Sequence, residues 1–433
     1  MIPGKGTLKS NHKTTPVKGI SVLKAAVVFG ANASGKSNLI KAINFGKKLV
    51  LEDIKPGQKI DYSKFRLNEL SIAGNSRLEY ELQHNGKNYA YGFVFNKDGI
   101  VEEWLYEVTK KSDKKIFVRN GSSFDLSYLI SINKRKEEKQ FINFIAKGTP
   151  DNKLFLNEIR HRKVKENVTD ISDITNVLDW FLNSLKVILP EDKYNVGLRF
   201  ELKDDEKLLK SFEQFLEYFD TGIDGVCLEP ISVEKVDIPD FLLKRISDDL
   251  LNANSEEKRA AILSDNNTTY FISIINNEVG YHKFMTKHII DSGKEVLFDT
   301  SEESDGTNRI IDFIPLLMDL LQGDNVFIID EMERSLHPNL IYDLIDLFLA
   351  KSINVNSQMI LASHESSLLT QKLLRKDEIW FTVKETDGST TIHSLEEYNI
   401  RFDKKIRKDY LLGRFKAIPK LGNRNNLTVL PNQ

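Results

Sequence analysis

Residues 30–37 read Gly-Ala-Asn-Ala-Ser-Gly-Lys-Ser, and this octapeptide constrains the fold more than any other part of the chain. The pattern is G-x-x-x-x-G-K-S, a loop whose backbone N–H groups wrap the phosphates of a nucleotide. An apolar run from Leu23 to Phe29, interrupted only by Lys24, precedes it, and a helix-like stretch from Asn38 to Ile43 follows it. The motif requires this strand–loop–helix setting. The octapeptide therefore predicts an α/β fold that binds nucleotide.

The small and polar positions of the octapeptide each have a role in that setting. Gly30 and Gly35 permit a tight turn and a close approach of the backbone to phosphate. Lys36 offers a point positive charge to the β- and γ-phosphates, and Ser37 offers a hydroxyl to Mg²⁺. The alternative is a chance glycine-rich turn, and the flanking runs argue against it. The residues predicted to bind nucleotide are Gly30, Asn32, Ala33, Ser34, Gly35, Lys36, Ser37 and Asn38.

Size and composition indicate a soluble globular protein. A length of 433 residues suggests two or three lobes. Lys plus Arg number 61 and Asp plus Glu number 63, so the net charge of −2 neither requires nor excludes a nucleic-acid partner. Cys227 is the only cysteine, which excludes an internal disulfide and fits a reducing cytoplasm. No apolar run approaches a membrane span, so we expect a cytoplasmic protein without a membrane partner.

The pattern of apolar residues changes along the chain. From Arg77 to Val118 it alternates with period two between turn signals such as Asn85-Gly86, which predicts an antiparallel meander. Amphipathic helices are predicted at 134–147, 170–188, 203–218 and 238–252. Strand and helix alternate again from Val296 onward. We therefore expect four segments: 1–130 with the loop and the meander, 131–290 as a helical insertion, 291–395 as the returning α/β part, and 396–433 as a basic tail.

A second set of residues supplies what hydrolysis needs. The apolar run Val326–Ile329 ends in Asp330 and Glu331, as expected for a buried strand whose acids emerge at its carboxyl end. Asp330 is placed to hold Mg²⁺, and Glu331 to polarise the attacking water as a general base. Another strand-like run, Met359–Leu361, is followed shortly by His364. A lone histidine after a strand is more often structural than catalytic, so its role depends on the other motifs.

Two further stretches flank this strand. Ser304 and Thr307 are natural N-cap residues before the mostly apolar run 310–321, and Gly306 lets a ligand approach the backbone. Taken alone, they indicate only a helix cap. Downstream, the polar turn 335–338 starts another helix.

The order of these motifs resembles the ATP-binding-cassette ATPases, within their SMC-like and OLD-like prokaryotic branch. The stretches G-A-N-A-S-G-K-S-N, E-S-D-G-T-x-R, I-I-D-E-M-E-R-S-L-H-P and S-H-E are similar to the AAA_15/AAA_21 group. The ending Y-L-L-G-R-F-K-A-I-P at 410–419 is similar to that of RloA-type ATPases, although Lys416 stands where that pattern usually has glycine. The resemblance implies an ABC/SMC-like P-loop NTPase head with a mixed sheet, an antiparallel β meander and a helical insertion.

The resemblance also implies a mechanism. Two heads sandwich ATP, so that Lys36 and Asp330 of one subunit face Ser304, Gly306 and Thr307 of another. His364 contacts the γ-phosphate, Ser37 and Asp330 hold Mg²⁺, and the catalytic set is Glu331, His364 and Lys36. The implied state is a homodimer or higher oligomer formed through the ATP site. The family further implies abortive-infection defence against phage, with a TOPRIM or RloB-like nuclease as a separate effector and DNA or a phage protein as the trigger.

Some features leave alternatives open. The family pattern has an N-F-x-S-F-like stretch before the first strand, and none precedes Leu23, so residues that contact the base are not identified. Phe65–Asn68 lies where a Q-loop is expected but is equally a plain loop. A DNA-maintenance ATPase is the main alternative function, because a basic run in the tail fits either phosphate contacts or a solvated tail. The members of this run are Arg401, Lys404, Lys405, Arg407, Lys408, Arg414, Lys416, Lys420 and Arg424. A fused TOPRIM nuclease is disfavoured, because only 433 − 364 = 69 residues follow His364.

Overall fold

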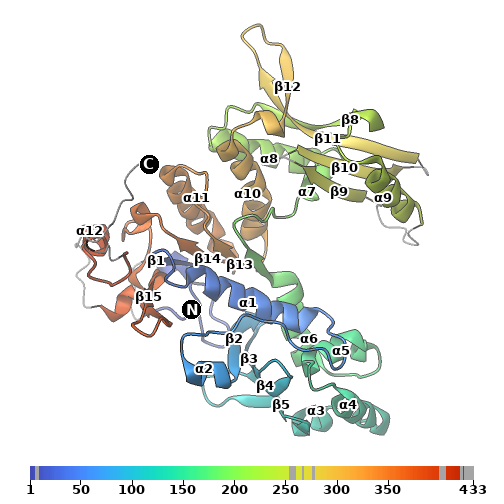
Figure 1. The fold of residues 1–433 in the computed structure, drawn as a ribbon, viewed down its shortest axis with the longest axis vertical. Helices are drawn as coiled ribbons and strands as arrows, with labels where there is room; N and C mark the ends of the chain where they lie inside the picture. Colours follow the sequence, from blue (N-terminus) through green and yellow to red (C-terminus); the bar gives the residue numbers. More distant parts are fainter. Residues whose placement is uncertain are drawn as a thin grey trace, which may run out of the picture. The chain divides into compact units, whose positions relative to one another are not determined.

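The computed structural model describes residues 1–4, 9–252, 260–265, 268–275, 278–398, 406–419 and 423. Of the basic run in the tail, Arg401, Lys404, Lys405, Lys420 and Arg424 lie outside these residues. The chain divides into two compact units (Figure 1). The first contains residues 1–190, 323–332 and 345–433, and the second contains residues 191–322 and 333–344.

A six-stranded sheet forms the centre of the first unit, in the order β16-β15-β1-β14-β13-β7. Its strands are β1 (Ala25–Gly30), β7 (Leu185–Ile188), β13 (Val326–Asp330), β14 (Gln358–Ser363), β15 (Ile379–Lys384) and β16 (Thr390–Ser394). All neighbours are parallel except β15 and β16. Every residue of β1 and β13 is buried, because helices and loops cover a parallel sheet on both faces. The predicted strands before the octapeptide and before Asp330 are confirmed.

An antiparallel meander follows α1 (Lys36–Leu51) and the short helix α2 (Glu69–Ala73). It is formed by β2 (Ser76–His84), β3 (Lys87–Phe95), β4 (Ile100–Glu107), β5 (Lys114–Asn120) and β6 (Ser123–Asp125), paired in chain order. Asn85 and Gly86 both have positive φ, 47° and 72°, which the tight hairpin between β2 and β3 requires. The predicted meander and this turn are confirmed.

Helices complete the first unit around one core. They are α3 (Ser127–Ile132), α4 (Lys136–Gly148), α5 (Phe155–His161) and α6 (Ser172–Asp179), and Trp180–Ser184 continues α6 as a π-helical turn. Side chains of α1, the meander, these helices, β7 and β13 pack into a single apolar cluster. The helix predicted over 170–188 is wrong at its end, because Leu185–Ile188 pairs with β13 as a parallel strand. A short apolar run fits a buried strand as well as a helix, so the pairing decides.

The second unit combines helices with its own sheet. Its helices are α7 (Leu198–Glu201), α8 (Glu206–Tyr218), α9 (Asp240–Asn252) and α10 (Asp305–Gln322). Its strands are β8 (Gly225–Ile231), β9 (Ala260–Asp265), β10 (Thr268–Ile275), β11 (Glu278–Ile289) and β12 (Glu295–Asp299). The sheet order is β12-β11-β10-β9, and β8 pairs with β11. The segment 131–290 therefore holds the expected helices but also most of an antiparallel sheet, whose period-two pattern the helical prediction overlooked.

Helix α11 (Pro338–Lys351) follows β13, as expected, but β14 leads only into the 3-10 turn Ser366–Leu368.

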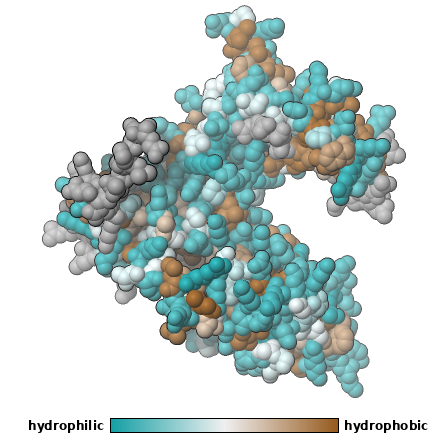
Figure 2. All heavy atoms as spheres, viewed as in Figure 1, coloured by the Kyte–Doolittle hydropathy of each residue, from teal (hydrophilic) through white to brown (hydrophobic). Residues whose placement is uncertain are grey.

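Helix α12 (Ile406–Leu411) and the residues after it contribute to a buried aromatic contact in the first unit. The ring of Phe415 stacks on Phe381 with centroids 4.6 Å apart, and the ring of Tyr410, in α12, lies 5.9 Å from that of Phe381. The described part of the tail is therefore packed onto β15. The visible face of the protein is mostly hydrophilic, with apolar patches in several places (Figure 2). Among the described helices, none combines the length and the apolarity that crossing a membrane requires.

Candidate nucleotide-binding site

The register of the parallel strands brings the predicted site residues of the first unit to one edge of the sheet. Phe29 pairs with Ser363, Gly30 pairs with Thr382, and Asp330 pairs with Ala362. Since the carboxyl ends of parallel strands meet at the same edge, the loop after β1, the acids after β13 and the histidine after β14 emerge side by side.

The loop between β1 and α1 has the conformation that its glycines predict. Gly35 has φ = +102° and Ala33 has φ = +61°, so two left-handed residues lie within the loop. A Cβ atom on Gly30 would lie 2.0 Å from Oγ1 of Thr382, and one on Gly35 would lie 2.2 Å from Oγ1 of Thr390. Both positions therefore exclude larger residues. The helix that follows directs its N-terminal N–H groups and partial positive charge at this loop.

Lys36 lies across the loop and is 5% exposed. Its Nζ atom donates hydrogen bonds to the carbonyl oxygens of Gly30 (2.8 Å) and Ala31 (3.2 Å) and lies 3.4 Å from Nδ1 of His364. Asn32, Ala33 and Asn38 are exposed at the surface of the loop, and Ser37 is half-buried at the start of α1. The structure thus brings Lys36 and His364 together.

Asp330 fits the role of a magnesium ligand. Its side chain is 1% exposed, and its Oδ1 atom is buried without a hydrogen-bond partner. A buried carboxylate oxygen without a partner is costly, and Mg²⁺ would satisfy it. Within the described ranges no group of three or more His, Cys, Asp or Glu side chains could hold a metal. Mg²⁺ at a nucleotide site takes most of its ligands from phosphate and water and only one or two from the protein, for which Ser37 and Asp330 are the candidates.

Glu331 and His364 are presented by tight turns at the ends of their strands. Glu331 has φ = +50°, a conformation that non-glycine residues seldom adopt, and its N–H donates to the carbonyl oxygen of Ala362 (3.1 Å). The hydroxyl of Ser363, which is 1% exposed, accepts from the N–H of Glu365 (3.0 Å), so His364 stands at the outer side of a turn. Backbone strain of this kind is concentrated at functional sites.

The signature residues belong to the second unit. Ser304 is the N-cap of α10, because its Oγ atom accepts from the N–H of Thr307 (3.0 Å), and the two hydroxyls are 2.8 Å apart. A Cβ atom on Gly306 would lie 3.0 Å from the carbonyl oxygen of Ser335, so a larger residue would require the turn at Ser335 to shift. Ser304 is exposed, while Gly306 and Thr307 are half-buried. The predicted cap is confirmed, and the meeting of these residues with a nucleotide stays a prediction.

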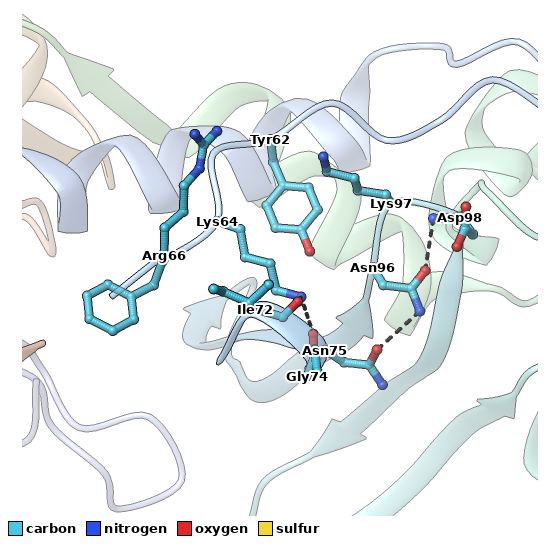
Figure 3. Close-up of a pocket in the computed structure, with 11 residues that line it drawn as sticks. Tyr62, Lys64, Arg66, Ile72, Gly74, Asn75, Asn96, Lys97 and Asp98 are labelled. Atoms are coloured by element: carbon cyan, nitrogen blue, oxygen red, sulfur yellow. Dashed lines mark hydrogen bonds between the residues drawn. The ribbon is translucent and has the colours of Figure 1, made fainter. Parts of the chain in front are cut away.

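The Phe65–Asn68 segment has a clear local role. The side chain of Asn68 accepts from the N–H of Leu70 (2.9 Å) and so caps α2. Phe65 and Arg66 border a hollow of about 480 Å³ between this segment and the β3–β4 turn (Figure 3). The Nζ atom of Lys64 donates to the carbonyl oxygen of Ile72 (2.7 Å) in its wall. The segment therefore forms a capped turn before α2.

Sequence reasoning missed two residues that touch the loop. Thr382 in β15 and Thr390 in β16 hydrogen-bond to Ser34, at 2.6 Å and 2.8 Å. A threonine within a strand-like run carries no signal of its own, because threonine is common in strands. Only the pairing of β15 with β1 places these hydroxyls beside the loop.

Solved structures of SMC head domains are similar to this chain. Among solved structures the chain is similar to the SMC head domain from Thermotoga maritima, with 12% identity, coverage of 86% of this chain and 92% of that chain, and a TM-score of 0.36. An SMC head bound to the C-winged helix domain of ScpA has 14% identity, coverage of 87% and 93%, and a TM-score of 0.30. A third, the Smc head domain with an extended coiled coil bound to the C-terminal domain of ScpA, from Pyrococcus furiosus, has 13% identity, coverage of 92% and 94%, and a TM-score of 0.27. No curated protein matches the chain.

A family model also matches most of the chain. The model named AAA_21 and described as "AAA domain, putative AbiEii toxin, Type IV TA system" matches residues 25–370. This range contains the loop at 30–37, the signature residues, both acids and His364. The expected resemblance to this group is confirmed, and since the match spans far more than half of the 433 residues, the chain belongs to the AAA_21 family of P-loop NTPases.

Proposed function

We propose that this protein binds and hydrolyses ATP and uses the nucleotide as a switch. One observation carries the proposal: Lys36 and His364 lie 3.4 Å apart, at the sheet edge where Asp330 and Glu331 also emerge. A cation for phosphate, a buried carboxylate for a metal and a second carboxylate for water are the parts that phosphoryl transfer requires.

Each residue has a defined task in this mechanism. Lys36 and the N–H groups at the start of α1 bind the β- and γ-phosphates. Ser37 and Asp330 would hold Mg²⁺, which neutralises charge on the phosphates when bound. Glu331 orients the attacking water and accepts its proton, and His364 contacts the γ-phosphate. On binding, phosphate oxygens replace the carbonyl oxygens of Gly30 and Ala31 as acceptors for the Lys36 ammonium.

The variant Glu331→Gln tests the chemistry. Its amide keeps the size of the side chain but cannot accept a proton, so ATP hydrolysis should fall by about 10² or more while nucleotide affinity stays the same. Steady-state phosphate release and equilibrium binding of labelled ATP measure the two effects. Glu102→Gln, an exposed carboxylate on β4, is the matched control and should retain full activity. Hydrolysis by Glu331→Gln at the wild-type rate would exclude Glu331 as the base.

We further propose that the switch acts in phage defence with a separate effector nuclease. The family description, which names a putative AbiEii toxin and a type IV toxin–antitoxin system, supports this role. A TOPRIM or RloB-like nuclease is the proposed effector, and DNA or a phage protein the trigger. Plating of phage on cells that express the chain with its neighbouring genes tests the proposal. Protection that is lost with Lys36→Ala supports it, and equal plating on both strains contradicts it.

DNA maintenance is a second candidate, favoured by exposed cations in the described part of the tail. Arg407, Lys408, Arg414 and Lys416 are all exposed. Deletion of the tail is a poor test, because it would strip the buried Tyr410 and Phe415 rings from Phe381. The double variant Lys408→Gln/Lys416→Gln keeps those rings. If the tail binds DNA, the slope of log affinity against log salt concentration should become shallower in this variant, by the amount expected for the loss of about two phosphate contacts. An unchanged slope would exclude these two cations.

A further inference from the structure

Two threonines of the β15–β16 hairpin contact the phosphate-binding loop from outside the motif. They lie 348 and 356 positions beyond the loop residue that they meet, which is Ser34 in both cases. Oγ1 of Thr382 lies 2.6 Å from Oγ of Ser34, and Oγ1 of Thr390 donates to the Ser34 carbonyl oxygen at 2.8 Å. Ser34 is 3% exposed and Thr382 is 1% exposed, so water does not replace the first of these contacts.

The hydrogen bonds have a defined direction. A threonine hydroxyl has one proton, and that of Thr382 is donated to the carbonyl oxygen of Phe29 at 3.2 Å. The hydroxyl of Ser34 must therefore donate to Thr382. The N–H of Ser34 donates to the carbonyl oxygen of Ala31 at 3.1 Å. All polar groups of Ser34 are thus bound within the protein, and the N–H groups at the start of α1 are left for a phosphate.

The same hydroxyls occupy the space beside both glycines of the motif. Oγ1 of Thr382 lies 2.0 Å from the position of a Cβ on Gly30, and Oγ1 of Thr390 lies 2.2 Å from that of a Cβ on Gly35. The loop and the hairpin therefore fit each other closely. A change in the loop's conformation would break these contacts, so the hairpin favours the conformation seen here.

We propose that Thr382 and Thr390 are positioning residues of the nucleotide site, which hold Ser34 so that the loop is ready to receive phosphate. This inference rests on the proposed ATP binding and deepens it. Without the Thr382 hydroxyl, the buried hydroxyl of Ser34 would lose its acceptor, and other loop conformations would become populated. Affinity falls in proportion to the fraction of competent loops. Neither threonine touches the reacting atoms, so the rate at saturating ATP should change little.

The variants Thr382→Val, Thr382→Ser, Thr390→Val and Thr391→Val test the proposal. Thr382→Val should weaken binding of a non-hydrolysable ATP analogue with Mg²⁺ about tenfold and raise KM with little change in kcat. Thr390 is exposed, so Thr390→Val should lower the affinity for the analogue only about two- to threefold. Thr382→Ser keeps the hydroxyl and should restore affinity. Thr391→Val is the matched control for Thr390→Val on strand β16, because the Thr391 hydroxyl donates to Glu385 and not to the loop.

A second measurement needs no nucleotide. Amide hydrogen exchange of residues 30–37 in the nucleotide-free protein should be faster in Thr382→Val than in wild type, and unchanged in Thr391→Val. The proposal would be overturned if Thr382→Val exchanged its loop amides and bound the analogue as wild type does. It would also be overturned if Thr382→Ser lost as much affinity as Thr382→Val. Failure of the wild-type protein to bind the analogue would contradict the proposed function instead, and the exchange data would still decide whether the hydroxyls hold the loop. If Thr382→Val does not fold, Thr390→Val decides by the same two measurements.

Discussion

The Nζ atom of Lys36 lies 3.4 Å from Nδ1 of His364, although 328 positions separate the two residues in the sequence. An ammonium group has only donors, so a hydrogen bond between these two atoms requires Nδ1 to be the acceptor. Lys36 is buried and His364 is exposed. The histidine is therefore the more accessible member of this pair.

His364 should affect turnover more than binding. In His364→Ala we expect hydrolysis to fall about 10²-fold, because a group that contacts the γ-phosphate acts mainly in the transition state. The dissociation constant of a non-hydrolysable analogue should change less than about threefold. His161→Ala, an exposed histidine at the end of α5, is the control. Equal losses in affinity and turnover would indicate a purely binding role.

Asp330 should set the magnesium requirement. Asp330→Asn keeps the shape of the side chain and removes the charge of the buried oxygen that has no partner. We expect the Mg²⁺ concentration for half-maximal hydrolysis to rise by about 10- to 100-fold, with nucleotide affinity in EDTA unchanged. Asp343→Asn, an exposed aspartate on α11, should leave the Mg²⁺ titration unaltered. A wild-type titration in Asp330→Asn would remove Asp330 from the metal site.

A shared site between subunits can be tested by mixing inactive variants. Lys36→Ala removes the phosphate contact, and Ser304→Arg places a bulky cation at the exposed cap of α10. Each variant alone should be inactive. If ATP lies between two copies, a mixed dimer contains one intact site, and an equimolar mixture should recover up to about a quarter of wild-type hydrolysis. A mixture as inactive as its components would argue against independent composite sites.

The backbone conformation at Lys416 explains why the tail pattern usually has glycine there, and its cost can be measured as protein stability. It has φ = +55°, a left-handed conformation that is unfavourable for lysine by about 1–2 kcal/mol and open to glycine. Lys416→Gly should therefore leave the melting temperature unchanged or raise it. Lys408→Gly, an equally exposed position within α12, should lower stability by about 1 kcal/mol. Thermal unfolding of the two variants in parallel compares them, and an equal loss in both would contradict the conformational argument.

Local patterns predicted the parts of the fold in which neighbouring residues decide the structure. The hairpin at Asn85-Gly86, the cap at Ser304 and the buried strand before Asp330 all depend on residues close in sequence. The predictions failed where distant pairing decides. Leu185–Ile188 became a strand because β13 offers it an open edge, and Ala260–Asp265, Thr268–Ile275 and Glu278–Ile289 formed a sheet within a segment expected to be helical.

The sequence by itself determined the family, the phosphate-binding loop and the identity of Lys36, Asp330, Glu331 and His364 as candidates, because their chemistry lies in residue type and spacing. Only the tertiary structure decided that Lys36 meets His364, that an oxygen of Asp330 is buried without a partner, and that Thr382 and Thr390 hold Ser34. The reason is that strands far apart in the chain are joined by the order and register of one parallel sheet. That order places side chains at a common edge which no local pattern specifies.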